Sequence, residues 1–512
     1  MCFPFAGWRT IVVALARAAR LRVDEAREIV TGYLQTLRPL IESSILFMKA
    51  TIFLTSVLVH IVFAVQAQSP VITNKLFSIG SYGRVGIARG DNIQYPRSLN
   101  LNGMGSIGGR MEEADYFELA TGLHFTPVSR RTDTTQINVQ ARFAFYTTQG
   151  QIIGNVTSNS YGGITVALPE LFAEARNIRG GPWSVWIGAR FFRGDDIHVI
   201  DHFYFDDHSS QGFGVQRKNT QFSIMFPASV DTTSSVPPYF YLNIVNGSPV
   251  LGLRNRAVYI LEHVLPVTDG YIKLLAEYQQ LASATLEDTA TTSNYPSDNG
   301  YVLGMKYKRN LQTSLPGSFY DASIRYGSGI ANGGDGGGTK TFLTYGGPNL
   351  GTMDFREAWS VAITGSLLWN ISRSYSLNPY VIFTKARGAS DSLNRTPDYQ
   401  GRSLFNRKVD FGIGARGTFY ITDWLHLLHE LHFARRKDGT QDPAQMVKFS
   451  IAPTVVPNGT RDVWSRPHFR LVYSVAHYNQ FAADNLYSPY LAQRGSKRWG
   501  HYFGVKTEWW LF

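Results

Sequence analysis

Hydrophobic and polar residues alternate with a period of two near the end of the chain, between Tyr502 and Leu511. One phase of the alternation consists of Phe503, Val505, Thr507, Trp509 and Leu511. The other phase consists of Tyr502, Gly504, Lys506, Glu508 and Trp510. Successive side chains of a β-strand point to opposite faces of the sheet. The pattern therefore predicts a strand with one apolar face and one mixed, polar face.

The same alternation recurs upstream, with charged residues on the polar phase. It is clearest in residues 75–87, 136–146, 409–421 and 466–475, which are separated by stretches rich in Gly, Ser, Thr and Asn. Strands of about ten residues, joined alternately by short turns and long polar loops, are typical of outer-membrane barrels. In lipid every backbone polar group needs a hydrogen-bonding partner, so such strands must close on themselves. The sequence therefore predicts an all-β fold, a closed antiparallel transmembrane β-barrel.

A large soluble β-sandwich or propeller is the alternative fold. It accounts for the strands, but it does not explain why Arg and Asp lie on the second face of nearly every strand. The chain has 512 residues, of which 17% are charged and 13% aromatic, and Cys2 is its only cysteine. These values favour one large β unit and exclude a disulfide scaffold. The net charge of +11 is not gathered into basic runs interleaved with aromatic residues, so nucleic acid is not an expected partner.

The first 67 residues have a different character. A lysine, a short apolar run and small residues follow Met48, and they end at Val65-Gln66-Ala67. This order is typical of a secretory signal peptide. The sequence therefore predicts an upstream extension at 1–47, a signal peptide at 48–67 and the barrel at 68–512. We interpret residues 1–47 as the product of a start codon assigned too early, with a genuine additional helix as the alternative.

One segment, from Val185 to Asp207, combines the pattern of a strand with dense charge and aromatic residues. Its charged and ionisable residues are Arg190, Arg193, Asp195, Asp196, His198 and Asp201, and Phe203, Tyr204 and Phe205 follow them. This composition is too charged to face lipid and too aromatic for a freely solvated loop. A constriction loop folded into the barrel, from Arg190 to Asp207, reconciles both properties.

This segment resembles the maltoporins, the sugar-specific porins of Gram-negative outer membranes. The matching motif is W-x-G-x-R-F, followed by D-x-H-x-I-D and an aromatic triplet. Four further stretches resemble the family in the same order: GSYGRVGI at 80–87, YFELATGL at 116–123, VWSRPHFR at 463–470 and FGVKTEWW at 503–510. Five matches in family order are specific, whereas any one alone would be weak.

The resemblance implies a barrel of about 18 strands that assembles as a homotrimer in the outer membrane. It also implies passive uptake of maltose and maltodextrins, without a cofactor. Sugar rings would slide along a row of aromatic side chains, while polar side chains opposite exchange hydrogen bonds with the hydroxyl groups. The implied aromatic track consists of Tyr82, Tyr116, Phe203, Trp464 and Trp510. The implied polar track and constriction consist of Arg84, Arg110, Glu118, Arg193, Asp196 and Asp201.

Several positions depart from the family pattern. Phe203 stands where the family has a tyrosine, so a hydroxyl group is lost. Gly194 replaces an arginine, and the neighbouring Arg193 is a candidate substitute. Two further candidates are Arg176, in place of the arginine expected at Ala173, and Tyr161, for the aromatic residue that a neighbouring subunit donates. The early loop disulfide of the family is impossible here.

Two other functions and a metal site are alternatives to the sugar channel. A general diffusion porin would share the barrel but not the sugar selectivity. An outer-membrane glycoside hydrolase would need an acid–base pair among Asp195, Asp196 and Asp201 at a defined separation. A metal site at His426, His429 and His432 is disfavoured, because a strand directs His429 away from the other two. The interpretation therefore includes no catalytic residue and no metal ligand.

The signal peptide yields a direct prediction. N-terminal sequencing of the protein extracted from outer membranes should begin at Gln68, because Val65 and Ala67 are the small residues that signal peptidase requires. A mature protein that still carries residues 1–47 would contradict this prediction and support the additional helix.

Overall fold

The computed structural model describes most of the chain after residue 71. The described residues are 72–73, 76–90, 93–94, 97–126, 134–147, 164–203, 205–227, 241–245, 248–252, 256–287, 292–313, 315–333, 340–397 and 403–511. The chain divides into two units, 1–67 and 68–512, and the description below concerns the second. The predictions for residues 1–47 and 48–67, for Tyr161 and for Tyr204 lie outside the described residues.

A single antiparallel sheet dominates the unit from Gln68 to Phe512. In the described residues it contains 20 strands, two of which, β1 (Ile72–Thr73) and β3 (Ile93–Gln94), are only two residues long. The other strands are β2 (Phe77–Gly90), β4 (Tyr116–Phe125), β5 (Gln136–Thr147), β6 (Ile164–Arg176), β7 (Trp183–Arg190), β8 (Ser210–Arg217), β9 (Thr220–Met225), β12 (Arg256–Val267), β13 (Gly270–Leu281), β16 (Asp298–Asn310), β17 (Phe319–Gly329), β18 (Trp359–Ser372), β19 (Tyr375–Arg387), β22 (Arg407–Tyr420), β23 (Leu425–Asp438), β24 (Ala444–Val455), β25 (His468–Tyr478) and β26 (Trp499–Leu511). These 18 strands form a closed barrel, as predicted.

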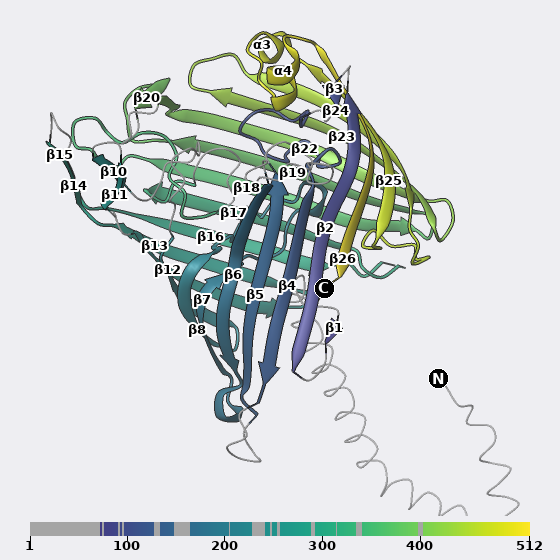
Figure 1. The fold of residues 1–512 in the computed structure, drawn as a ribbon, viewed down its shortest axis with the longest axis horizontal. Coiled ribbons are helices and arrows are strands. Elements are labelled where there is room, and N and C mark those ends of the chain that lie inside the picture. Colours follow the sequence, from purple (N-terminus) through teal and green to yellow (C-terminus); the bar gives the residue numbers. More distant parts are fainter. Residues whose placement is uncertain are drawn as a thin grey trace, which may run out of the picture. The chain divides into compact units, whose positions relative to one another are not determined.

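Closure occurs between the last strand and the first long strand, β26 and β2 (Figure 1). They pair in antiparallel register from Ser81 opposite Leu511 to Gly90 opposite Tyr502. On its other edge β26 pairs with β25, and β2 pairs with β4. Every long strand therefore has two neighbours, which leaves no open sheet edge in the bilayer.

The two ends of the barrel differ in their connections. Residues 218–219 and 268–269 form tight turns at one end, here called the short-turn end. The other, long-loop end carries the segments that precede β4, β8, β18 and β26. The small ribbons β10–β11 (Tyr241–Val245 with Ser248–Gly252), β14–β15 (Ala284–Glu287 with Thr292–Tyr295) and β20–β21 (Arg395–Pro397 with Ser403–Phe405) belong to such connections.

Short helices also belong to the connections. The segment between β25 and β26 contains α3 (Gln480–Asp484) and α4 (Pro489–Arg494). Their first turns are capped by the side chains of Asn479 and Ser488, which accept hydrogen bonds from backbone N–H groups inside each helix. A 3₁₀ turn, η1 (Ile178–Gly180), joins β6 to β7. Within the described residues, no helix is long and apolar enough to span a bilayer.

The predicted alternation of the strands is confirmed. Outward-facing apolar side chains are highly exposed, for example Ile87 at 70% and Ile187 at 65%. Inward-facing charged side chains are buried, including Lys448 and Glu508. Because lipid surrounds a transmembrane barrel, the apolar face meets hydrocarbon and the charged face lines or fills the bore.

Three segments from the long-loop end fold into the barrel. They are the first inward segment (97–115), the constriction loop (191–209) and the third inward segment (340–358), which all contain many buried residues. Ser106 Oγ of the first donates to the carbonyl oxygen of Ile200 in the constriction loop. The backbone N–H of Thr341 donates to the carbonyl oxygen of Asp207, at 3.1 Å. The three segments therefore form a connected layer across the bore.

The inward constriction loop was predicted, although its bounds differ slightly. Arg190 still belongs to β7, and the loop continues to residue 209 before β8 begins. The inward course of 97–115 and 340–358 was not predicted, because neither segment has the mixed charged and aromatic composition that marked the constriction loop.

Trp509 lies on the outer face at the closing seam. Its ring centroid is 6.3 Å from that of Phe117, and its indole Nε1 donates to Ser81 Oγ at 3.0 Å. Gly83 is its cross-strand partner, and a Cβ atom there would lie 2.1 Å from the indole ring. Glycine at this position therefore leaves room for Trp509 to lie across β2 and reach β4.

Replacing Trp509 with Ala should weaken barrel closure. The indole bridges three strands, so its loss should lower the free energy of unfolding by about 1–3 kcal/mol, less than for a fully buried tryptophan. Urea unfolding in detergent micelles and the heat-modifiable band on a cold SDS gel would measure this. Leu511→Ala, on the same face at the strand end, is the control and should have a smaller effect. Equal effects of the two substitutions would show that Trp509 does not hold the seam.

Candidate functional site

The constriction loop is anchored to one wall of the barrel by ion pairs. Asp195 accepts from Lys308 Nζ at 2.5 Å and from the Tyr271 hydroxyl at 3.1 Å. Asp206 accepts from Lys273 Nζ at 2.5 Å. Burial raises the pKa of Asp195, but the charges of Lys308 and Lys306 outweigh burial and hold this pKa below its usual range. Both carboxylates are therefore ionised anchors on β13 and β16.

A second anchor lies at the end of the loop. His208 is 2.8 Å from a carboxylate oxygen of Glu277 on β13. Burial lowers the pKa of His208, but Glu277 more than compensates and raises it above its ordinary value. The contact between His208 and Glu277 therefore adds a second attachment of the loop to the β13 wall.

The tip of the loop reaches the opposite wall at the short 3₁₀ turn η2 (His198–Ile200). The ring centroid of His198 is 4.8 Å from that of Trp464 and 5.0 Å from that of Trp510. Arg466 Nη2 is 3.3 Å from His198 Nε2. Burial lowers the pKa of His198 to about 4, so its ring is neutral at neutral pH. The loop thus spans the bore from β13 and β16 to β26.

The structure gathers four of the predicted aromatic residues into two groups. Tyr82 and Tyr116, on β2 and β4, have ring centroids 5.8 Å apart. Trp464 and Trp510, from the turn before β25 and from β26, have ring centroids 6.0 Å apart. Tyr146 extends the first group, with its ring 6.3 Å from that of Tyr116. Tyr146 and His198, which touches both tryptophans, were not predicted as members of an aromatic track.

Arginine side chains lie over three rings of the predicted aromatic track. The guanidinium carbon of Arg466 is 4.1 Å from the ring centroid of Trp510. That of Arg193 is 3.9 Å from the centroid of Phe203. That of Arg84 is 5.3 Å from the centroid of Tyr116. Each contact contributes roughly 0.5–2 kcal/mol, so a ligand that stacks on the covered face must displace a guanidinium group.

The polar groups converge on Glu508, two residues before Trp510. Its carboxylate accepts from Arg110 Nη2 at 2.7 Å and from His468 Nε2 at 3.0 Å. Arg470 also donates to it, and Arg466 Nε lies 3.4 Å away. One carboxylate on the closing strand is therefore shared by three arginines and a histidine.

The predicted residues Arg84 and Arg110 meet at Tyr82. The tyrosine hydroxyl accepts from Arg84 Nη1 at 3.0 Å and from Arg110 Nη2 at 2.7 Å, and it donates to Glu508 at 3.2 Å. Glu113 lies 3.1 Å from Arg84 and 3.3 Å from Arg110. The first inward segment, which contains Arg110 and Glu113, therefore brings both of them to the strand residues.

The two predicted carboxylates of the constriction loop, Asp201 and Asp196, lie beside different groups. Burial raises the pKa of Asp201, but Arg110, Arg84 and Arg193 lower it below its usual range. Asp196 lies 3.8 Å from His198 Nδ1. Both carboxylates therefore lie next to groups that line the constriction.

Glu118 belongs to a separate ionic chain. It accepts from the Tyr116 hydroxyl and from Arg142 Nη1, the latter at 2.6 Å. Arg142 Nε in turn donates to Glu170 at 2.7 Å. Arg142 is fully buried, and it was not predicted as a functional residue.

The positions of Ala173 and Arg176 do not support the prediction that Arg176 replaces an arginine expected at Ala173. Ala173 is the cross-strand partner of Val139, on the outward phase of β5. Arg176 lies at the end of β6, pairs with Glu174 at 2.7 Å and is 45% exposed. A side chain at Ala173 would point away from the bore, because paired residues of a sheet share a face.

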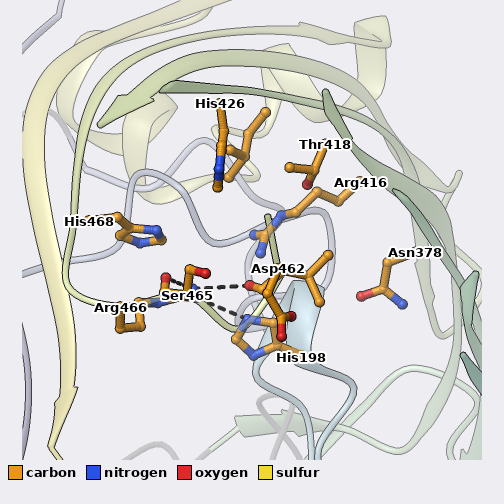
Figure 2. Close-up of a pocket in the computed structure, with 11 residues that line it drawn as sticks. His198, Asn378, Arg416, Thr418, His426, Asp462, Ser465, Arg466 and His468 are labelled. Atoms are coloured by element: carbon orange, nitrogen blue, oxygen red, sulfur yellow. Dashed lines mark hydrogen bonds between the residues drawn. The ribbon is translucent and has the colours of Figure 1, made fainter. Parts of the chain in front are cut away.

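A pocket opens on the short-turn side of the constriction loop (Figure 2). It is lined by His198, Asn378, Arg416, Thr418, His426, Leu428, Asp462, Val463, Ser465, Arg466 and His468. Its basic and imidazole groups were not predicted as functional. The inward phase of β22 and β25 already placed Arg416 and His468 on the bore side, but it could not show that the two strands share a pocket.

The histidines of β23 lie on both faces of the strand, as expected. His426 and His432 are buried inside, whereas His429 stacks on Tyr375 and Phe419 on the outer face. Among the described residues, no three His, Cys, Asp or Glu side chains are placed to hold a metal ion.

Residues 77–510 match the sequence model of the family described as LamB porin. No curated protein sequence matches the chain significantly. Solved structures similar to this chain include Pseudomonas aeruginosa OccK8 (OprE), at 12% identity and a TM-score of 0.41, covering 86% of this chain and 99% of that one. They also include Pseudomonas aeruginosa OccD3 (OpdP), at 10% identity and a TM-score of 0.40, covering 87% and 94%. These scores are too low to carry an inference about the site.

Neutralising Asp196 and Asp201 together should shift ion selectivity towards anions. The Asp196→Asn/Asp201→Asn variant removes two negative charges while Arg84, Arg110 and Arg193 remain, and charges at a narrow point dominate permeation. Asn also tolerates the left-handed backbone of Asp201, whose φ is 48°. The reversal potential in a KCl gradient should report a rise of about twofold or more in the anion-to-cation permeability ratio.

The control for this experiment is Asp423→Asn. Asp423 is 66% exposed and pairs with Arg461 in a turn at the short-turn end, so its loss should leave selectivity unchanged. Unchanged selectivity in the double variant would mean that the constriction loop does not control ion flow.

Proposed function

Because the chain belongs to the LamB porin family, we propose that this outer-membrane porin is a passive channel for oligosaccharides of the maltose and maltodextrin type. Sugars pass along Tyr82, Tyr116, Phe203, Trp464 and Trp510. The polar residues Arg84, Arg110, Glu118, Arg193, Asp196 and Asp201 exchange hydrogen bonds with their hydroxyl groups. The proposal includes no chemical step and no cofactor, and the working assembly is a homotrimer.

The observation that carries the proposal is the position of Trp510. Its ring packs with Trp464 and His198 at the tip of the constriction loop, and Glu508 lies on the same strand face two residues earlier. A sugar ring has two apolar faces and a belt of hydroxyl groups around its edge. An aromatic pair beside a carboxylate and arginines suits both parts of such a ring.

The weak strength of each contact suits transport. A stacking contact and a few exchangeable hydrogen bonds hold a sugar long enough to guide it, but they also let it leave. Tyr82 and Tyr116 provide a second stacking surface, on β2 and β4. Movement between the two groups of aromatic residues would then replace one modest contact with another.

A general diffusion porin is the second candidate, and one observation favours it. Guanidinium groups lie over Trp510, Phe203 and Tyr116, so these rings are partly occupied without any sugar. If these arginines do not move, the bore would pass small solutes without stacking on them. Sugar block of the ion current distinguishes the two candidates.

Replacing Trp510 with Ala should weaken block of the ion current by maltotriose. The loss of one aromatic contact should reduce binding by about 0.5–1.5 kcal/mol, or roughly two- to twelvefold in affinity. Noise analysis of single trimers in planar bilayers would measure the dissociation constant and the open-channel current together. Trp509→Ala is the matched control, because the adjacent indole lies on the outer face.

Two results would count against the proposal. If maltotriose and longer maltodextrins fail to block the wild-type current at millimolar concentration, the protein is a general porin. If Trp509→Ala weakens block more than Trp510→Ala, sugar binding does not depend on the inner face of β26.

A further inference from the structure

The pocket on the short-turn side of the constriction loop has an unusual charge composition. Among the described residues that line it, Arg416 and Arg466 are the cations and Asp462 is the one carboxylate. The remaining polar groups are hydroxyl, amide and imidazole groups. Burial lowers the pKa of one imidazole, that of His198, to about 4, so this ring is neutral at neutral pH. In Figure 2 the guanidinium group of Arg416 and the ring of His426 both point into the space between these residues.

Arg416 has donor capacity that the protein does not use. Its Nε donates to Glu430 at 2.5 Å, and its side chain is 9% exposed. Its Nη2 is buried and has no hydrogen-bond partner among the described residues, and neither has Nε2 of the buried His426. An unused donor on a buried guanidinium is unfavourable unless a ligand or water satisfies it.

Arg466 lies close to other arginines that repel it. It shares the carboxylate of Glu508 with Arg110 and Arg470. Burial lowers the pKa of Arg466 to about 9, although the attraction of Glu508 opposes this shift. Repulsion by neighbouring arginines lowers the pKa further; these are Arg470, Arg416 and Arg110. Additional negative charge in the pocket would therefore be stabilised.

We infer that this pocket binds the anionic group of a sugar, a carboxylate or a sulfate ester, through Arg416 and Arg466. The inference rests on the proposed sugar channel and specifies its substrate class, which includes acidic oligosaccharides as well as neutral ones. A planar guanidinium group matches two oxygens of a carboxylate or sulfate, and such charge-assisted bonds are about twice as strong as neutral ones. Trp464 lies in the turn before β25, between the pocket residues Val463 and Ser465. It would stack on the sugar ring that bears the acidic group.

Asp462 limits how tightly the anion is held. It is exposed in the turn before β25, where its Oδ1 accepts from the backbone N–H of Trp464 at 2.9 Å. Its negative charge opposes the ligand at the edge of the pocket. A channel requires release as well as capture, and a nearby like charge promotes release.

The test compares three trisaccharide probes in planar bilayers at about 0.1 M KCl, where charges are only partly screened. The probes are maltotriose, sulfated maltotriose and trigalacturonate. With the wild-type channel, at least one acidic probe should block the current about tenfold more tightly than maltotriose, as expected for one charge-assisted pair. Which acidic probe binds tighter distinguishes a sulfate from a carboxylate substrate.

Two variants should change the affinity for the acidic probes in opposite directions. Arg416→Gln should remove the preference for the acidic probe, and Asp462→Asn should increase it, while maltotriose block changes little in either. Arg461→Gln is the control, since this arginine lies in the same turn and pairs with Asp423, but is 39% exposed and does not line the pocket. Because Asp462 is exposed, its variant tests the inference even if Arg416→Gln fails to assemble.

The outcomes separate this inference from the proposed function. If maltotriose blocks the current and neither acidic probe binds more tightly, the inference is wrong and the sugar channel stands. If no probe blocks the current, the proposed function is wrong, and the inference that rests on it is wrong as well. If acidic probes bind tightly but Arg416→Gln and Asp462→Asn leave their affinity unchanged, the anion binds elsewhere and the inference is wrong.

Discussion

Pairing of β26 with β2 is the constraint on which the rest of the structure depends. A backbone amide in hydrocarbon must be hydrogen-bonded within the protein, so a sheet in the bilayer has to close. Closure fixes which side chains face inwards, because neighbouring residues on a strand alternate between lipid and bore. It also fixes Trp509 outside and Trp510 inside, although the two are adjacent. The apolar side chains therefore face the lipid, and the polar side chains fill the interior of the barrel.

An interior built from charged residues is stable only if its charges are paired. The barrel meets this requirement with ionic chains that run across strands, such as Arg142 between Glu118 and Glu170. The first inward segment contributes Glu112, which accepts from the buried Lys448. Inward segments therefore do more than narrow the bore, because they supply partners that the strands lack. Where the pairing is incomplete, at Nη2 of Arg416, a buried donor remains for the anion binding inferred above.

At the constriction, arginine side chains stack on the aromatic rings, so exposure of a ring depends on movement of the arginine above it. An arginine over a ring stabilises the empty channel, and the same arginine is a hydrogen-bond donor for an arriving ligand. Movement of Arg466 off Trp510 would expose an aromatic face and release a donor at the same time. The neutral ring of His198, in contact with both tryptophans, connects this exchange to the constriction loop. Binding would thus replace internal contacts of similar strength, which keeps the net affinity modest.

The sequence by itself determined the features that depend on local order. The period-two alternation identified the strands and their faces, and charge mixed with aromatic residues identified the constriction loop. The resemblance to the family named Tyr82, Arg84, Arg110, Trp464 and Trp510, and the structure places these residues near the constriction loop. A strand periodicity, however, says which face a residue occupies and not which strand lies across the bore.

The tertiary structure decided everything that depends on distances across the barrel. It placed His198 against both tryptophans, folded 97–115 and 340–358 inwards, and laid arginines over three of the predicted aromatic rings. It also showed that Ala173 faces outwards and that Arg416 and His468, from separate strands, line one pocket. These features depend on register, closure and side-chain contacts between residues far apart in the chain. No local pattern encodes such contacts, because each becomes possible only after the whole sheet has closed.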